Sequence, residues 1–143
     1  MTEVKYAIAE RVAAGYDEAV SWARDALKEQ GFGVLTEIDV KKTMKEKLDV
    51  EYRPYVILGA CNPALAHQAL TAEPDIGLML PCNVVVYEES PGSCVVEAVS
   101  PIAALGVVNN PALMDVAEQA STRLKTAMSA VAARAKQKAP ASI

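Results

Sequence analysis

Two stretches of this chain are apolar on every side, and they constrain its fold more than any other feature. They are PYVILGA, residues 54–60, and CNVVVY, residues 82–87. Successive side chains of a β-strand point to opposite faces of the sheet, so a strand that is apolar throughout must be covered on both faces. Helices of this chain are expected to cover one face. The other face needs a partner, and a second copy of the chain, giving a homodimer, is the simplest candidate.

Periodicity places the other elements around these two strands. Apolar residues alternate in 3–12 and 31–40, which predicts a strand in each, and Ser90-Pro91-Gly92 predicts a hairpin between 79–89 and 93–100. Helical spacing of apolar residues predicts the helices. These are a long helix at 16–30, a short basic helix at 41–50, a helix at 63–72 and a last long helix from 111 to at least 131.

Three short signals set the ends of these helices. Gly31 can adopt the left-handed conformation that ends a helix, so it is expected to close the first one. Asn62-Pro63 and Asn110-Pro111 each combine a capping side chain with a proline suited to the first helical position. The same device is therefore expected to start two different helices.

These elements predict the α+β class. We expect a two-layer sandwich, in which a largely antiparallel five-stranded sheet carries two long helices and shorter helices on one side. No Gly-rich phosphate loop opens a helix, which disfavours a Rossmann or P-loop fold. With 143 residues, 52% of them hydrophobic, the chain suits one domain over 1–135. The Ala/Lys-rich residues 136–143 are expected to fray.

Charge and cysteine content narrow the classes of partner. Fourteen basic and eighteen acidic residues give a net charge of −4, which argues against a general nucleic-acid binder. The chain shows neither a signal-peptide pattern nor an apolar run long enough to span a membrane, so we expect a cytoplasmic protein with no membrane partner. Three cysteines are an odd number, and in a reducing compartment they are expected to be thiols.

The dipeptide Cys-Asn occurs twice, at Cys61-Asn62 and Cys82-Asn83. Cys61 ends a strand just before a helix start, where the helix dipole can lower the pKa of a thiol. If the two strands are neighbours, both thiols can bind a soft metal ion, exchange a disulfide or carry sulfur. Their separation of 21 residues is neither a zinc nor a thioredoxin signature. The alternative, that both thiols simply pack in the core, stays open.

The polar neighbours of these thiols have two interpretations each. Asn62 has a sufficient role as a helix cap, whereas Asn83 has no cap to make and either holds the Cys61 loop or faces a ligand. His67, the only histidine, is expected just beyond the apolar face of its helix, either as a partly exposed surface residue or as the base for a Cys61 nucleophile, although no third residue is placed to orient it. Cys94, in the return strand of the hairpin, is expected to pack.

One region concentrates charge. Glu37 and Asp39 share a strand face, either as paired carboxylates or as the solvent side of an antiparallel sheet. The basic residues that follow form either a solvated helix or an anion site. They are Lys41, Lys42, Lys45, Lys47 and Arg53, of which Lys41, Lys42 and Lys45 are the anion-binding candidates.

Several blocks together resemble the domain of unknown function 302 family. They are GFGVLTEIDV, KKTMKEKL, YRPYVILGACNPALAHQALTAEPDIGLMLPCNVVV and the late Asn110-Pro111, which extend the similarity from Tyr6 to Val131. The resemblance implies a small α+β fold similar to the TATA-box-binding-protein-like class, often dimeric, with no settled activity. At 100–104 this chain has SPIAA, where many members have Asp-Pro followed by a methionine-containing turn. If that turn lines a site, the site is altered here.

Three functions from different classes follow. The first is a dimeric binding or carrier module that holds a small ligand, a metal ion or a sulfur species. The second is a structural or regulatory dimer without ligand chemistry. The third is a thiol-dependent enzyme with Cys61 as nucleophile and His67 as base, which ranks last because no complete set of nucleophile, base and orienting group can be recognised. Ligand-binding candidates are Cys61, Asn62, Cys82 and Asn83, with Cys61 and Cys82 also the metal candidates, and the sequence points to no particular cofactor.

Overall fold

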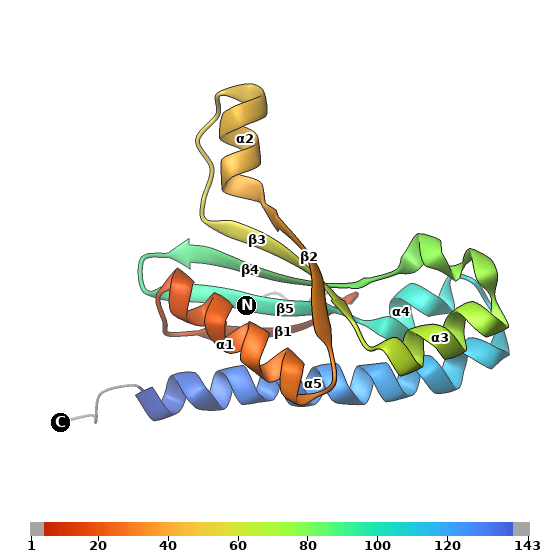
Figure 1. The fold of residues 1–143 in the computed structure, drawn as a ribbon. Helices are drawn as coiled ribbons and strands as arrows, with labels where there is room; N and C mark the ends of the chain where they lie inside the picture. Colours follow the sequence, from red (N-terminus) through yellow and green to blue (C-terminus); the bar gives the residue numbers. More distant parts are fainter. Residues whose placement is uncertain (1–4, 139–143) are drawn as a thin grey trace.

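The computed structural model describes residues 5–138 and shows the expected α+β fold. Five strands, five α-helices and two short 3-10 helices follow one another along this part of the chain (Figure 1). In order they are β1 (Ala7–Val12), α1 (Tyr16–Glu29), β2 (Gly33–Asp39), α2 (Val40–Leu48), β3 (Tyr55–Cys61), α3 (Pro63–Ala72), η1 (Pro74–Met79), β4 (Cys82–Ser90), β5 (Ser93–Val99), α4 (Pro101–Gly106), η2 (Pro111–Leu113) and α5 (Met114–Lys138).

All five strands form one antiparallel sheet in the order β1-β5-β4-β3-β2. The two stretches that are apolar on every side became β3 and β4, which pair with each other inside the sheet, so the two strands that carry Cys61 and Cys82 are neighbours. Strands β1 and β2 form the edges. A β-bulge between Val34 and Thr36 interrupts the β2 edge, and Leu35 at this bulge is exposed.

Helices α1 and α5 cover one face of the sheet (Figure 1). The core between the two layers is built from alternate strand residues and from the inner stripes of both helices. Its fully buried large side chains include Leu27, Leu58, Val84, Val86, Leu124 and Met128. No helix within residues 5–138 is long and apolar enough to cross a membrane.

The predicted signals mark the expected helix ends, except that Asn110 caps a short 3-10 turn instead of the long last helix. Gly31 has φ of 82°, and the Phe32 amide donates to the Leu27 carbonyl at 2.9 Å, so the glycine closes α1 as expected. The Leu65 amide donates to Asn62 Oδ1 at 3.2 Å, which caps α3. Asn110 caps the 3-10 turn η2, and the long helix α5 begins only at Met114.

Two short helices were not anticipated. Ser100 caps α4 by accepting from the Ala103 amide at 3.3 Å, whereas the sequence predicted here only the strand over 93–100. The 3-10 helix η1 follows Glu73 and begins with Pro74, but the Glu73 side chain makes no capping hydrogen bond. At the other end of the described chain, α5 continues to Lys138, and residues 139–143 of the tail expected to fray lie outside the described residues. Lys138 pairs there with Glu18 and lies over the Trp22 ring.

The layered core predicts that two leucines contribute very differently to the free energy of unfolding. Leu58 is fully buried between β3 and the helices, so Leu58→Ala removes buried methyl groups and leaves a cavity, which should lower the free energy of unfolding by about 2–5 kcal/mol. Leu35 is 68% exposed at the bulge, so Leu35→Ala should change it by less than about 0.5 kcal/mol. Urea denaturation of both variants measures this difference, and equal losses would contradict the assigned layers.

Candidate functional site

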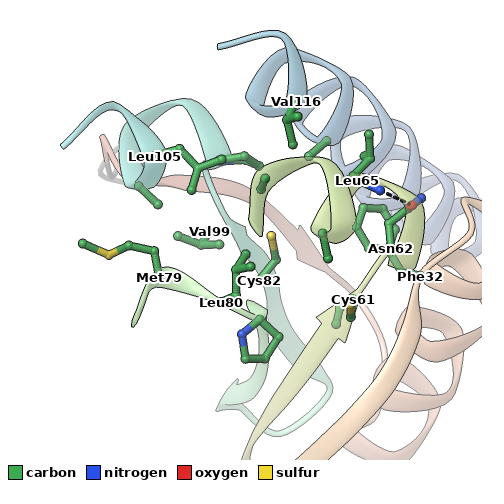
Figure 2. A pocket seen from close by; sticks show the side chains of 17 residues that line it. Phe32, Cys61, Asn62, Leu65, Met79, Leu80, Cys82, Val99, Leu105 and Val116 are labelled. Atoms are coloured by element: carbon green, nitrogen blue, oxygen red, sulfur yellow. Dashed lines mark hydrogen bonds between the residues drawn. The ribbon is translucent and has the colours of Figure 1, made fainter. Parts of the chain in front are cut away.

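A small cavity lies where β3 and β4 end against α3, α4 and α5, and Figure 2 shows it from close by. Its volume is about 40 Å³. Seventeen residues line it, and apart from Asn62 and two thiols their side chains are apolar. They are Phe32, Ala60, Cys61, Asn62, Leu65, Ala66, Ala69, Met79, Leu80, Pro81, Cys82, Val99, Pro101, Ala104, Leu105, Val116 and Ala120.

A close approach of β2, β3 and the segment before β4 fixes the sheet beside this cavity. A Cβ atom added to Gly59 would collide with Thr36 Oγ1 and would lie 2.9 Å from Cγ of Pro81. Only glycine, which has no Cβ, leaves room for the Thr36 and Pro81 side chains at this position of β3. Gly59 thereby sets how β3 and the segment before β4 enter the cavity wall.

Cys82 directs its sulfur toward α3, into the cavity (Figure 2). Burial, with a smaller contribution from Cys61, raises the pKa of the Cys82 thiol to about 11. The thiol is therefore protonated and neutral at pH 7. A neutral thiol is a poor nucleophile and a poor metal ligand, because the thiolate is the reactive species in both cases.

Cys61 lies on the neighbouring strand but faces differently. Cys82 pairs with Ala60 in the β3–β4 register, so Cys61 is one residue beyond that pair. Consecutive residues of a strand point to opposite faces, and Cys61 therefore leaves the sheet on the side opposite to Cys82. Both half-buried residues contribute atoms to the cavity wall. The two thiols therefore lie close together at the β3–β4 corner but point to opposite sides of the sheet.

The two asparagines lie in different surroundings, one at the cavity and one outside it. Asn62 lines the cavity, and its Oδ1 is already engaged by the Leu65 amide. Asn83 pairs with Gly59 across the strands, is exposed and lies outside the cavity wall. Three of the four predicted ligand-binding residues thus meet at one cavity, and the structure places Asn83 on the other face of the sheet.

The remaining sulfur and imidazole groups lie elsewhere. His67 is exposed on α3, in a surface groove that it shares with Thr71 and Asp115, and it is absent from the wall of the cavity that Cys61 lines. Cys94 is buried, and its Sγ lies 3.4 Å from the Ala14 carbonyl oxygen to which it donates. Burial also raises the pKa of the Cys94 thiol, consistent with a packing role.

The three candidate anion-binding lysines stand on α2, apart from the cavity. Lys45 Nζ lies 2.8 Å from Asp49 and 3.2 Å from Glu51, and these two carboxylates raise its pKa. Lys42 pairs loosely with Glu46 at 3.9 Å, and both lysines border a surface groove with Lys41. Carboxylates on α2 and on the segment after it therefore neutralise the charges of Lys42 and Lys45, two of the three candidate lysines.

The two strand carboxylates have structural roles. Glu37 pairs with Arg24 of α1 at 2.8 Å, and Asp39 caps α2 by accepting from the Lys42 amide at 2.9 Å. Across residues 5–138, no group of three His, Cys, Asp or Glu side chains is arranged to hold a metal ion.

The part of the cavity wall that η1 and α4 contribute was not predicted from the sequence. Met79 ends η1, Leu80 follows it, and Pro101 and Leu105 belong to α4; all four line the cavity. Figure 2 shows Met79 and Leu105 on the side away from Phe32. Ser100-Pro101 has the same cap-then-proline pattern as Asn62-Pro63. That pattern was the available signal for α4.

The environment of Cys82 predicts slow alkylation. At pH 7.5 iodoacetamide should modify Cys82 far more slowly than a free cysteine, because almost none of it is thiolate below its pKa of about 11. The rate should rise steadily with pH up to pH 9. Peptide mapping by mass spectrometry measures the modification at each cysteine, with urea-unfolded protein as the control. Modification of folded Cys82 at the unfolded rate would show that the thiol is not buried.

Comparison with known proteins agrees with this architecture. The chain is similar over 90% of its length to the crystal structure of an uncharacterized conserved protein DUF302 from Bacillus stearothermophilus, of which 99% is covered, with 31% sequence identity and a TM-score of 0.82. No curated protein matches it. The family model described as Domain of unknown function DUF302 matches residues 8–131. The chain therefore belongs to the DUF302 family, as the resemblance of its sequence blocks predicts.

Proposed function

We propose that this protein is a binding or carrier module for a small apolar ligand, held in the cavity at the Cys61/Cys82 corner. The observation that carries the proposal is the composition of the wall, in which Asn62 and the two thiols are the only polar side chains. Concave apolar pockets with few polar groups are the usual form of small-molecule sites. Ligand binding without catalysis is sufficient to explain why the cavity wall is almost entirely apolar.

The polar groups at the cavity favour an uncharged guest. Asn62 Oδ1 already accepts from the Leu65 amide, and the Cys82 thiol is neutral. A charged group entering here would lose its hydration without gaining a partner, which is costly. An apolar group would instead add contacts with a wall that water solvates poorly.

The size of the cavity sets the size of the guest. One water molecule needs roughly 10–15 Å³ of such space, so about 40 Å³ admits only a few heavy atoms. The guest is a small molecule or the end of a longer one. Met79 stands at the wall and is partly exposed, and the flexible methionine side chain can move to widen the entrance.

The other functions have less support from the geometry. A metal ion or a sulfur species needs thiolates, yet the Cys82 pKa is raised and the thiols leave opposite faces of the sheet. An enzyme with Cys61 and His67 needs the imidazole near the thiol, and His67 faces a separate groove. A structural or regulatory role is the second candidate, favoured by the small volume of the cavity. Three free cysteines suit the cytoplasm as the compartment.

Xenon tests the cavity, because it is an uncharged probe that enters apolar holes. In NMR spectra under xenon pressure, we expect shifts concentrated at Leu65, Leu105 and Val116. Ala104→Leu places a larger side chain at the wall and should abolish these shifts. Ala103→Leu is the matched control, since Ala103 lies next to it on α4 but is exposed and outside the wall. Shifts that are absent in the wild type, or that survive in Ala104→Leu, would refute the proposal.

A further inference from the structure

The two edges of the sheet differ in how regular they are. An edge strand presents unpaired backbone groups, and proteins commonly interrupt such edges with bulges. The β2 edge is interrupted in this way, between Val34 and Thr36. Strand β1 instead pairs with β5 without a bulge over all six of its residues, Ala7 to Val12, and contains no proline. The outer side of β1 is therefore a regular template on which a further strand can pair.

The register of β1 shows which of its backbone groups face outward. The Ser100 amide donates to the Tyr6 carbonyl at 2.7 Å, so these two residues form a hydrogen-bonded pair. In antiparallel strands, such pairs alternate with pairs that do not hydrogen-bond to each other. Ala7, Ala9 and Arg11 occupy the alternate positions, so their amide and carbonyl groups point away from β5. Within residues 5–138 these outward groups have no backbone partner.

A groove beside this edge has room for the side chains of an added strand. Helix α5 packs against β1 (Figure 1), and a surface groove of about 510 Å³ lies between them. On α5 the groove is lined mainly by the small side chains of Ser129, Ala132 and Ala133. Ser129 and Ala133 are exposed, so nothing in the described part of the chain fills the groove above them. Every second side chain of a strand added beside β1 would enter this groove.

Charge at the groove limits the kind of segment that fits. Glu10 lies on the same face of β1 as the buried Val12, and such an inward charge disfavours pairing with a fully apolar strand. Lys136 lines the groove with the opposite charge, and neither residue forms an ion pair within residues 5–138. Arg11 is neutralised by Glu89 at 2.8 Å. The groove thus favours neither sign of charge, and it suits uncharged side chains.

We propose that an extended segment of a partner protein adds to the sheet as a sixth strand beside β1. Its backbone pairs with the outward amide and carbonyl groups of Ala7, Ala9 and Arg11, and its alternate, uncharged side chains lie in the groove under α5. Only an extended backbone matches the spacing of all these groups. The inference goes beyond the proposed ligand cavity, whose wall shares no residue with this groove.

Displayed peptides test whether the edge accepts a strand. Random ten-residue peptides on phage are selected against the wild-type protein, and the enriched sequences are synthesised as free peptides. We expect these peptides to lack proline and to shift backbone amide signals of β1 and of the groove wall on α5 in NMR spectra. A selection that yields no binding peptide, or peptides that shift signals of another surface instead, would overturn the proposal.

Two variants at one position test the backbone contact. Ala9→Pro removes an outward amide that does not pair with β5, and an edge strand tolerates proline at such a position. This variant should bind the selected peptides at least about tenfold more weakly, because it leaves a buried carbonyl of the peptide unpaired. The matched variant Ala9→Val keeps the amide and should bind them as the wild type does. Equal affinity of both variants would contradict pairing with β1.

Methylated peptides identify the binding mode without altering the protein, and therefore also serve if Ala9→Pro fails to fold. N-methylation should abolish binding at every second peptide residue, where the amide faces β1, and preserve it at the residues between them. A peptide that is equally sensitive at all positions would exclude an added strand. Light scattering of the free protein tests the other occupant. A dimer that Ala9→Pro dissociates would show that a second copy covers the edge, and would likewise overturn the proposal.

Discussion

Strand β3 pairs with β4 without interruption from Tyr55 with Tyr87 to Ala60 with Cys82, and the other layers are arranged around this pairing. Alternation sends Val56, Leu58 and Ala60 into the helical layer. A slip of one residue would turn these side chains outward and bring Ile57 and Gly59 inward, which the well-filled core does not allow. The same register fixes the cavity wall at one end of β3 and the pair of Tyr55 and Tyr87 at the other.

The register also determines what the two Cys-Asn pairs can do. Since Cys82 stands opposite Ala60, Cys61 is displaced by one position and its side chain leaves the other face. The two thiols lie close together but leave the sheet on opposite faces, so they are not placed to act together on one metal ion or sulfur species. The site is therefore defined by apolar side chains from five segments, with Cys82 as a neutral member of the wall.

Local patterns predicted most of the fold. Alternation identified the strands, and Asn62-Pro63 identified the start of α3, because both signals lie within a few residues. The layout of the site depended on strand register, which cannot be derived from local spacing, and on α4, whose local signal is Ser100-Pro101. Alternation alone already implied that Asn83 and Cys82 face opposite ways. Only the pairing with β3 shows which of the two meets the helices.

Gly59 connects three separate parts of the chain. A side chain at this position would meet Thr36 on β2 and Pro81 before β4, so the space it leaves is already filled from both sides. Positions 36, 59 and 81 therefore form one steric unit, in which a larger residue at one site requires a smaller residue at another. Natural sequences of this fold should vary at these three positions together, because a single enlargement would push apart the strands that carry both thiols.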